Sequence, residues 1–333
     1  MSAPLIELAP EGLYCPPADV YIDPWRPVRR AILTHAHADH ARYGSQFYLA
    51  HHQSAGVLRL RLGRGIHLTT KGYGESFSIR GVRFSLHPAG HIPGSAQIRI
   101  AHRGEVWVLS GDYKVEDDGL STAFEPVRCH TFLTESTFGL PVYQWQPQRI
   151  IFDQINQWWQ TNQQAGKASI LSAYSLGKAQ RLLAGVDVSL GPIYVHGAIA
   201  NTNEALTKDG YRLPKVLRVE NGIPRSAYRN ALVIAPPSAL GSPWAKKFQP
   251  YSTGIASGWM ALRGQRRRRA ADRGFVLSDH ADWPGLLKAI SATGAERVLT
   301  THGYAAVLAR YLTEQGLQAQ EVETFFEGDG EDG

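Results

Sequence analysis

One segment near the N-terminus, Thr34-His35-Ala36-His37-Ala38-Asp39-His40, constrains this chain more than any other. Imidazole and carboxylate groups are the ligands that borderline divalent ions prefer. So short a peptide cannot wrap all four groups around one tetrahedral ion without strain, but it can offer His35 and His37 to one ion and Asp39 and His40 to a neighbour. The chain has only 13 histidines in 333 residues, so chance explains this spacing poorly. The segment predicts a two-metal centre, which activates water and stabilises a phosphoryl or carbonyl oxygen.

Length and composition describe an ordinary globular protein. A chain of 333 residues exceeds one comfortable hydrophobic core, so we expect two domains or one large α/β unit. The two cysteines provide no disulfide framework, which favours a cytoplasmic location. Residues 1–4 do not open a signal peptide, and no run of about 18 apolar residues predicts a membrane span.

Arginine is concentrated in one part of the chain. Six arginines fall within eleven residues: Arg263, Arg266, Arg267, Arg268, Arg269 and Arg273. Most charge runs are solvated helix faces, but four consecutive arginines project around all sides of a helix. Arginine also favours bidentate phosphate contacts. We therefore expect this cluster to bind nucleic acid, and we expect the acidic, glycine-rich residues 327–333 to be a frayed tail.

Apolar periodicity changes along the chain. Short strands are predicted in the first third at 31–34, 47–50, 82–86, 97–101 and 106–110, the last two as a hairpin, with a helix at 53–62. The middle begins with an amphipathic helix at 148–163 and then alternates strands and helices from 169 to 235, including a helix at 203–207. Strands are again predicted at 275–278 and 297–301. This pattern predicts sheets covered by helices, interrupted by a parallel α/β insert.

Further metal ligands are expected beyond the first motif. His91, Asp112 and His302 each come just after a predicted strand and next to a glycine, which is the placement of the first motif. The carboxylate of Asp112 is the natural bridge between two ions. Three such residues in the same setting favour a metal role more strongly than any of them alone.

Other polar residues are candidates for supporting roles. His280 follows a predicted strand and could protonate a leaving oxygen, with Glu135 holding its imidazole in orientation. Asp23 could fix a ligand imidazole from behind. Either acid could equally be a surface residue by sequence alone.

The first motif followed by His91, Asp112, Glu135, His280 and His302 resembles the β-CASP nuclease branch of the metallo-β-lactamase fold over nearly the whole chain. The resemblance implies an α/β protein: a four-layer αββα metal domain (residues 1–145 and 273–333) with an inserted α/β β-CASP domain (146–272). It implies two divalent ions, zinc or alternatively manganese. One would take His35, His37, His91 and Asp112, and the other Asp39, His40, Asp112 and His302.

Three segments, at 172–180, 235–244 and 257–264, are similar to bacterial ligase-associated DNA exonucleases. That likeness implies an exonuclease acting on single-stranded DNA ends in DNA repair, associated with a DNA ligase and a helicase. A histidine at position 302 is also the pattern of RNA-processing members of the branch, so RNA is an alternative substrate.

The expected reaction is metal-dependent hydrolysis of a phosphodiester. Asp39, His280 and Glu135 are the expected catalytic residues, with His280 as the acid. Candidate phosphate contacts outside the arginine cluster are Lys114, Tyr174 and Ser278. Two other readings remain: a small-molecule metallo-hydrolase, which the insert and the arginines disfavour, and an inactive scaffold, which should have lost ligands.

Overall fold

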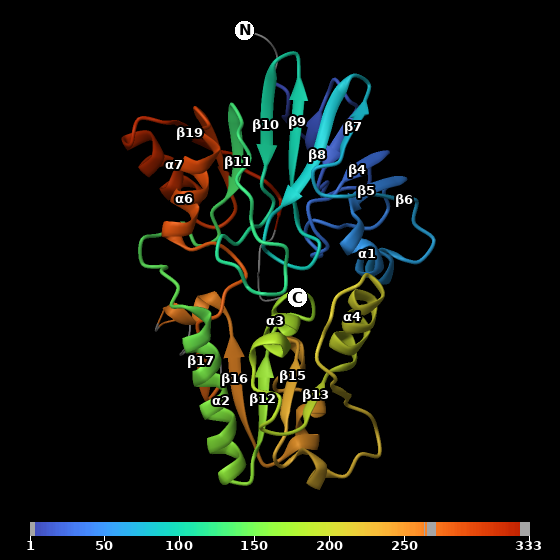
Figure 1. The fold of residues 1–333 in the computed structure, drawn as a ribbon, viewed down its shortest axis with the longest axis vertical. Helices are drawn as coiled ribbons and strands as arrows, with labels where there is room; N and C mark the ends of the chain where they lie inside the picture. The colour runs from blue at the N-terminus through green and yellow to red at the C-terminus, as the bar shows by residue number, and fades with distance from the viewer. Residues whose placement is uncertain (1–3, 263, 265–270, 327–333) are drawn as a thin grey trace. The chain divides into compact units, whose positions relative to one another are not determined.

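A computed structural model describes residues 4–262, 264 and 271–326 of the chain. The described residues form two compact units. We call residues 4–144 with 280–326 the metal unit, because they contain the predicted ligands, and residues 145–279 the insert (Figure 1). The fold is mixed α/β with several sheets, as predicted at that level. The four-layer arrangement stays a prediction.

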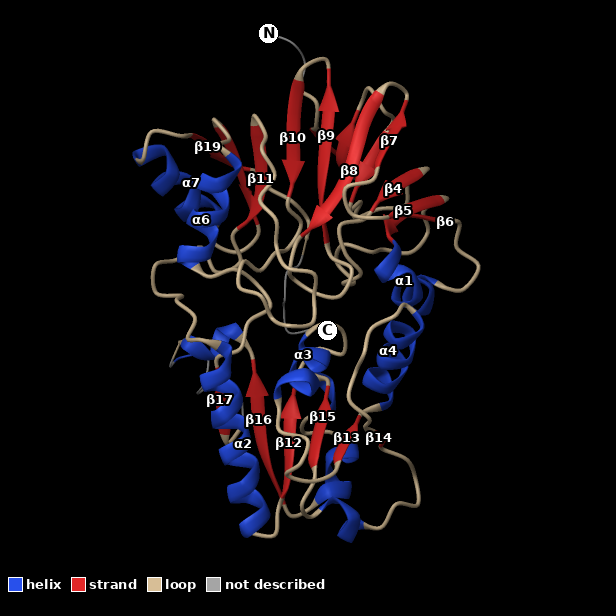
Figure 2. Ribbon diagram, viewed as in Figure 1, coloured by secondary structure: helices blue, strands red, loops and turns tan. Residues whose placement is uncertain are grey.

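The metal unit contains two sheets (Figure 2). The six-stranded sheet has the order β1-β2-β3-β4-β5-β6, with strands Glu7–Ala9, Gly12–Cys15, Val20–Ile22, Arg30–Ile32, Phe47–His51 and Leu68–Lys71. The seven-stranded sheet has the order β19-β18-β11-β10-β9-β8-β7; in chain order its strands β7 to β11, β18 and β19 are Ser76–Ile79, Val82–Pro88, Ala96–His102, Glu105–Leu109, Thr131–Glu135, Arg297–Thr301 and Gln318–Glu321. The predicted hairpin is present, since β9 and β10 pair antiparallel.

Alternate side chains of the seven-stranded sheet enter different cores. Leu109, Leu133 and Leu299 belong to a cluster that also contains residues of the six-stranded sheet, so the two sheets share this core. Their neighbours along the strands, such as Val108 and Phe132, belong to another cluster. This two-residue period is what a sheet with both faces covered requires.

Two helices cover the second face of that sheet. Helices α6 (Trp283–Thr293) and α7 (Ala305–Glu314) place their buried side chains in the same cluster as Val108 and Phe132. Helix α6 begins where Asp282 accepts a hydrogen bond from the backbone N–H of Gly285 at 2.9 Å. A shorter helix, α1 (Ala55–Leu62), follows the 3₁₀ turn η1 (His52–Ser54) between β5 and β6.

The insert is built on one parallel sheet with the order β14-β13-β15-β12-β16-β17. In chain order its strands β12 to β17 are Ala168–Ser172, Ile193–Val195, Leu217–Arg218, Leu232–Ala235, Tyr251–Ala256 and Arg273–Phe275. Helices α2, α3 and α4 of the insert span Gln148–Gln164, Lys178–Gly185 and Gly197–Lys208. Its 3₁₀ turns η2 to η5 are Arg225–Tyr228, Pro237–Ala239, Pro243–Phe248 and Gly258–Ala261.

Both faces of the insert sheet are buried. Leu171 and Ile234 pack with α2, α3 and α4 in one cluster. Ile170 and Val233, one residue away on the same strands, pack with η2 and η4 in another. Continuous apolar strands are typical of parallel sheets for this reason.

Two elements start earlier than the sequence predicted. Helix α4 begins at Gly197 rather than near 203, because His196 accepts a hydrogen bond from the backbone N–H of Ala198 and so caps the helix. Strand β17 ends at Phe275, whereas a strand was predicted over 275–278. The carbonyl of Ser278 instead accepts a hydrogen bond from Arg181, so this segment has left the sheet.

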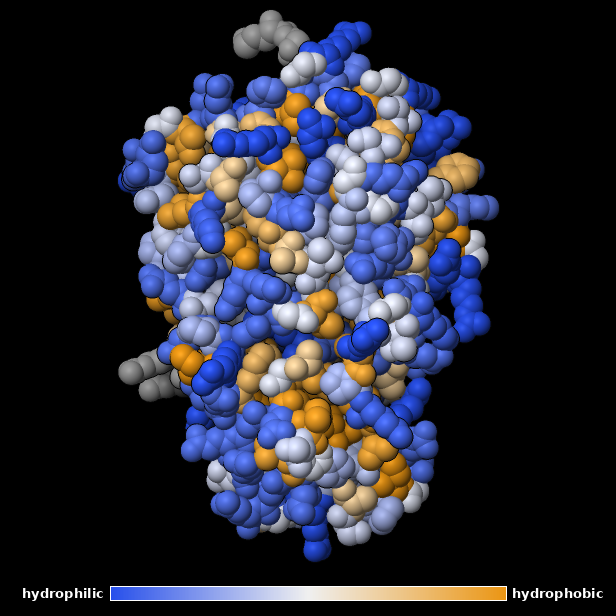
Figure 3. All heavy atoms as spheres, viewed as in Figure 1, coloured by the Kyte–Doolittle hydropathy of each residue, from blue (hydrophilic) through white to orange (hydrophobic). Residues whose placement is uncertain are grey.

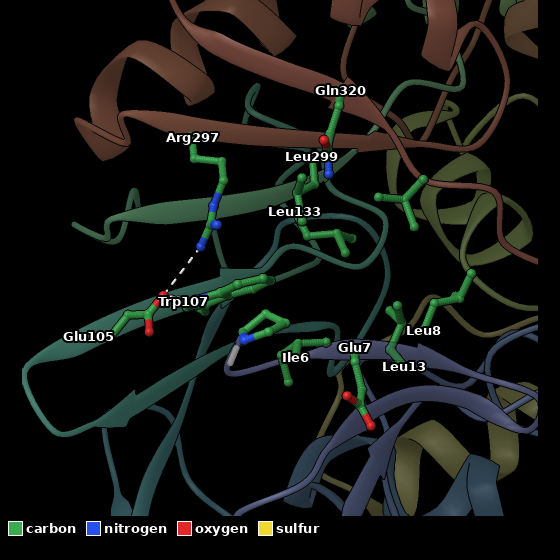
Figure 4. A pocket seen from close by; sticks show the side chains of 12 residues that line it. Ile6, Glu7, Leu8, Leu13, Glu105, Trp107, Leu133, Arg297, Leu299 and Gln320 are labelled. Atoms are coloured by element: carbon green, nitrogen blue, oxygen red, sulfur yellow. Dashed lines mark hydrogen bonds and ion pairs between the residues drawn. The ribbon is translucent and has the colours of Figure 1, made fainter. Parts of the chain in front are cut away.

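An apolar cavity of about 690 Å³ opens in the metal unit (Figure 4). Its lining includes Leu13, Trp107 and Leu299, with the Glu105–Arg297 ion pair, 3.3 Å between Nη2 and Oε1, at its side. Glu105 and Arg297 begin β10 and β18, whereas the predicted metal ligands follow the ends of these strands. The cavity therefore lies away from the candidate chemistry.

One face of the molecule is mixed in character. Hydrophilic side chains cover most of the face in view in Figure 3, and apolar residues gather in a group in the lower half of that view. No helix of the described residues combines the length and apolar character that crossing a bilayer requires. Both cysteines, Cys15 and Cys129, are buried free thiols, and burial raises the pKa of each to about 11.

Candidate metal centre

The predicted ligands follow the carboxyl ends of different strands of the metal unit. The first motif follows β4, and His91, Asp112 and His302 follow β8, β10 and β18. Polar residues there extend beyond the ordered sheet and can converge without disturbing the core. The structure brings all seven predicted ligands into two groups.

Three imidazoles and one carboxylate form the first group. Their ligand atoms lie within 4.8 Å of one another and belong to His35, His37, His91 and Asp112. Nδ1 of His37 is 3.2 Å from Nε2 of His35 and 3.1 Å from Nε2 of His91. Oδ2 of Asp112 is 3.5 Å from Nε2 of His35. Nitrogen and oxygen atoms so arranged are a donor set for zinc and related ions.

The second group contains Asp39, His40 and His302, again within 4.8 Å. Nε2 of His40 is 3.5 Å from Oδ2 of Asp39 and 3.6 Å from Oδ2 of Asp112. The same oxygen of Asp112 therefore lies close to ligand nitrogens of both groups. This is the position of a bridging carboxylate.

Several of these atoms have no hydrogen-bond partner among the described residues. They are Nε2 of His40, Oδ1 of Asp112 and both ring nitrogens of His302, and all of them are buried. Burying a polar atom without a partner costs about 1–3 kcal/mol. Bound cations would satisfy such atoms, so the residues present fit a pair of divalent ions.

The pKa values of the ligands depend on burial and on their neighbours. Burial, together with nearby histidines, lowers the pKa of His35 well below its usual value and that of His302 to about 3. Burial also acts to lower the pKa of His40, but the carboxylates of Asp39, Asp112 and Asp23 outweigh it and raise this pKa to about 10. Burial raises the pKa of Asp112 to about 8. Without metal, the neighbouring His40 and Asp112 therefore hold at least one proton between them at neutral pH.

Asp23 lies behind the ligands. Its Oδ2 is 2.8 Å from Nδ1 of His40, and Thr34 donates to it through its hydroxyl at 2.5 Å and to Oδ1 through its backbone N–H at 2.8 Å. Binding Nδ1 leaves Nε2 of His40 facing the second group. Orientation of this kind is what ligand histidines in metal sites require.

Glu135 holds His280. Nδ1 of His280 is 3.0 and 2.9 Å from the two carboxylate oxygens of Glu135, and the backbone N–H of Tyr113 donates to Oε1 at 2.7 Å. Burial would raise the pKa of Glu135, but the charge and hydrogen bond of His280 outweigh it and lower this pKa. Asp112, Glu135 and His280 could also hold a cation. Both oxygens of Glu135 are engaged by His280, however, so this arrangement favours an oriented imidazole.

Two backbone positions at the site lie in the left-handed region. Asp23 has φ 43° and His302 has φ 63°. Residues other than glycine adopt this region at a cost, and such residues cluster at functional sites. Gly303 follows with φ 58°, and a Cβ there would lie 2.6 Å from the backbone of Thr137. The loop that carries His302 therefore depends on a glycine.

The sequence did not single out two residues of this site. Thr34 Oγ1 lies 3.0 Å from Nδ1 of His35 and thus connects that ligand to Asp23. The ring of Phe326 stacks on His40 at 4.5 Å and on His302 at 4.8 Å between centroids. Thr34 stands in the motif itself, but a phenylalanine near the C-terminus gives no such signal.

The predicted phosphate contacts lie in different settings. Lys114 is buried, and its Nζ is 2.8 Å from Glu116. Nζ of Lys178 lies 4.8 Å from the ring centroid of Tyr174. Ser278 is buried in the insert. Arg263 and Arg266–Arg269 lie outside the described residues. The nucleic-acid contacts stay predictions.

A buried ion cluster lies within the insert. Oδ1 of Asp279 is 3.1 Å from Nη1 of Arg181, and Oδ2 is 3.4 Å from Nζ of Lys178. All three side chains are at most 3% exposed. Asp279 immediately precedes His280 in the chain, so this cluster fixes the backbone at the start of the His280 segment.

Formal charge is divided unequally along the chain. Residues 145–279 contain 18 Lys and Arg against 7 Asp and Glu, a formal charge of +11. The remaining residues contain 17 against 22, a charge of −5. The insert is therefore strongly basic even though the whole chain is only +6.

Comparison with known proteins identifies several relatives. No family model matches the chain. A protein of Opitutus terrae named "Probable DNA ligase" is 31% identical over 312 residues, covering 92% of this chain and 30% of that protein. Cleavage and polyadenylation specificity factor 73 of Drosophila melanogaster is 29% identical over 118 residues, covering 35% and 17%. Endoribonuclease YSH1 of Saccharomyces cerevisiae is 26% identical over 118 residues, covering 35% and 15%.

This chain spans less than a third of the length of these curated relatives. Among solved structures, a protein of unknown function from Enterococcus faecalis V583 aligns with a TM-score of 0.61 over 89% of this chain and 79% of that chain, at 10% identity. That likeness concerns the fold alone. Together with the clustered ligands, the curated relatives support a β-CASP, nuclease-like family of metal-dependent hydrolases, and with it a metallo-β-lactamase/β-CASP fold, for this chain.

Proposed function

We propose that the protein is a two-metal nuclease that hydrolyses phosphodiester bonds, and that it acts as a DNA exonuclease in repair. The observation that carries the proposal is the shared carboxylate: Oδ2 of Asp112 is 3.5 Å from His35 of one ligand group and 3.6 Å from His40 of the other. Bound divalent ions, zinc or manganese, would supply Lewis acidity and lower the pKa of water at this site.

The ligands divide between the ions as the two groups suggest. His35, His37 and His91 would hold one ion, and Asp39, His40 and His302 the other, with Asp112 serving both. The fit of both groups rests on the geometry and on the buried atoms of His40, Asp112 and His302 that have no hydrogen-bond partner in the described part of the chain. Asp23 and Thr34 keep the imidazoles in orientation, which limits the entropy lost when an ion binds.

His280 delivers the proton to the leaving oxygen. Glu135 holds Nδ1, so Nε2 is the nitrogen that can donate. The carboxylate of Glu135 stabilises the protonated imidazole that an acid catalyst needs before it acts. After the reaction His280 takes up a proton from solvent, and the carboxylate of Glu135 again stabilises the positive charge of the imidazolium.

The charge of the insert favours a polyanionic substrate. A formal charge of +11 over residues 145–279 attracts a phosphate backbone at long range and raises the association rate. A lactam or thioester carries too little charge to benefit from such a field. This supports a nuclease over a small-molecule hydrolase of the same fold.

DNA is the preferred substrate in this proposal. The relative named a probable DNA ligase matches 92% of the chain, whereas the endoribonuclease relative matches 35%. The first likeness also supports action beside a DNA ligase; association with a helicase stays a prediction from family resemblance. RNA is the second candidate, favoured by the endoribonuclease relative and by the presence of His302.

A time course on end-labelled strands tests the proposal. DNA and RNA of matched sequence, with and without a 5′ phosphate, are incubated with the protein and Mn²⁺ or Zn²⁺. We expect DNA to shorten stepwise from one end, and Asp39→Ala to be inactive. Preferential RNA cleavage would replace the DNA assignment, and internal cuts would replace the exonuclease. Hydrolysis of nitrocefin without cleavage of either strand would refute the nuclease.

A further inference from the structure

Three side chains gather at the carboxyl ends of three neighbouring strands of the insert. His196 follows β13, Arg218 ends β14, and Trp244 lies in η4, after β15. These strands are adjacent because the sheet order begins β14-β13-β15. In parallel α/β sheets, ligands bind just outside the carboxyl ends of the strands. We call these three residues the β13–β15 cluster.

Arg218 lies against Gly197, the residue that follows His196, and His196 in turn contacts Trp244. Arg218 pairs with Val195 across β13 and β14, and its Nη2 is 3.1 Å from where a Cβ of Gly197 would be. The guanidinium therefore lies against the bare backbone of Gly197. The rings of His196 and Trp244 are 5.1 Å apart between centroids, at 68°.

Arg218 is a cation without an anion. It is exposed, its Nη1 donates to Oδ1 of Asn201 at 2.9 Å, and it forms no ion pair among the described residues. A neutral amide partner holds the guanidinium in place but leaves its charge unbalanced. The planar, multi-donor guanidinium is suited to phosphate oxygens.

Trp244 and His196 add a partly exposed aromatic surface beside that cation. Trp244 packs its ring on Phe248 at 4.7 Å between centroids and remains partly exposed, with no hydrogen bond from its indole N–H among the described residues. Nδ1 of His196 accepts from Ala198, so Nε2 carries the hydrogen of the neutral ring. Burial, then the charge of Arg218, lowers the pKa of His196, which keeps the ring neutral at pH 7.

We propose that the β13–β15 cluster is a binding subsite for a single-stranded polynucleotide, in which Arg218 binds one phosphate and the Trp244–His196 pair contacts the adjoining base. An aromatic ring and a cation side by side are the combination that sequence-independent single-strand binding uses. The proposal rests on the proposed nuclease function and assigns part of its strand binding to residues distant in sequence from the metal ligands.

Binding is measured without cleavage. Fluorescence anisotropy of a labelled single-stranded DNA in EDTA gives Kd at several salt concentrations for the wild type, Arg218→Gln and Trp244→Leu. The leucine keeps an apolar contact with Phe248, and circular dichroism checks that each variant is folded. We expect binding about tenfold weaker in each variant. Loss of one phosphate contact should also reduce the slope of log K against log salt by about 0.7 in Arg218→Gln.

A matched control separates this site from general charge. Arg149 is another insert arginine, 92% exposed and paired with Asp153, so Arg149→Gln removes the same charge elsewhere. Equal weakening by Arg149→Gln and Arg218→Gln would overturn the subsite, because only net charge would then matter. Unchanged binding in Arg218→Gln and Trp244→Leu would overturn it too.

A third variant tests the geometry with Arg218 retained. Gly197→Ala places a Cβ 3.1 Å from Nη2 and should shift the guanidinium by a few tenths of an ångström, so we expect binding to weaken by less than in Arg218→Gln, although alanine is the better helix former. Unchanged binding in this variant would argue against the geometry. A wild type that binds strands through the cluster but cleaves none would refute the nuclease and leave the subsite standing. If the wild type cleaves strands and all three variants bind them normally, the subsite is refuted and the nuclease stands.

Discussion

The metal unit and the insert handle charge in opposite ways. The metal unit concentrates carboxylates and imidazoles at a few strand ends, within a part of the sequence that is net negative, and buried atoms of His40, Asp112 and His302 have no hydrogen-bond partner among the described residues. The insert is net positive, its buried Asp279 is matched by Lys178 and Arg181, and its exposed Arg218 forms no ion pair within the part of the chain that the structure describes. The metal unit is suited to binding cations, and the insert is suited to binding a polyanion. A nuclease needs both, since reaction and strand binding make opposite electrostatic demands.

The largest effect should come from removing the shared ligand. Asp112→Asn deletes the carboxylate that lies close to both ligand groups, so we expect loss of bound metal and at least about a 1000-fold fall in cleavage, roughly 4 kcal/mol of barrier. Metal content by mass spectrometry and initial rates measure this. Strand binding by this variant in EDTA should match that of the wild type. If binding fell as far as cleavage, it would be wrong to assign the reaction to the metal unit and strand binding to the insert.

Replacing the proposed acid should cost less. His280→Gln retains a polar side chain beside Glu135, and we expect cleavage to fall by about 100- to 1000-fold with metal content unchanged. The loss of activity should be smaller for a substrate with a good leaving group, such as a nitrophenyl phosphodiester, because nitrophenolate departs without a proton. An equal loss on both substrates would contradict the acid role.

A stability test addresses the insert. Asp279→Asn removes the carboxylate between two buried cations, and we expect a loss of about 3 kcal/mol in the free energy of unfolding of the protein, measured by urea denaturation. Asp153→Asn breaks an exposed pair with Arg149 and should change stability by less than about 0.5 kcal/mol. Similar losses in the two variants would show that burial does not determine how much each ion pair contributes to the free energy of unfolding.

The smallest expected effect is the release of protons when metal binds. The carboxylates around His40 raise its pKa and burial raises that of Asp112, so the pair holds at least one proton at pH 7 before metal binds. Coordination requires the unprotonated forms of both groups, so metal uptake should release about one proton or more, and affinity should rise with pH between about 6 and 9. Calorimetry in two buffers of different ionisation enthalpy measures the release. Uptake without proton release would place these ligands outside the metal shell.

The sequence was most informative where chemistry and chain order coincide. The motif from Thr34 to His40 contains four of the seven clustered ligands, and the other three stand beside glycines after strands, so a reader of the sequence could collect them. The roles of Asp23 and Glu135 were proposed, and the structure places each against an imidazole. Their catalytic contributions remain predictions.

What escaped the sequence depends on strand order. Nothing in the chain shows that β13, β14 and β15 are neighbours, so His196, Arg218 and Trp244 could not be grouped beforehand. The contact of Phe326 with His40 and His302 has the same cause, because it joins opposite ends of the sequence. Ser278 was predicted in a strand, and a hydrogen bond from Arg181, 97 residues earlier, holds it elsewhere.

The two buried cysteines make this protein convenient for site-specific labelling. With a pKa of about 11, roughly one thiol in ten thousand is a thiolate at pH 7, and burial of Cys15 and Cys129 shields even that fraction from reagents. A cysteine introduced on an exposed turn, for example at Ser189, should therefore react alone with a maleimide dye. The native chain needs no cysteine removed before a fluorophore can report on its partners.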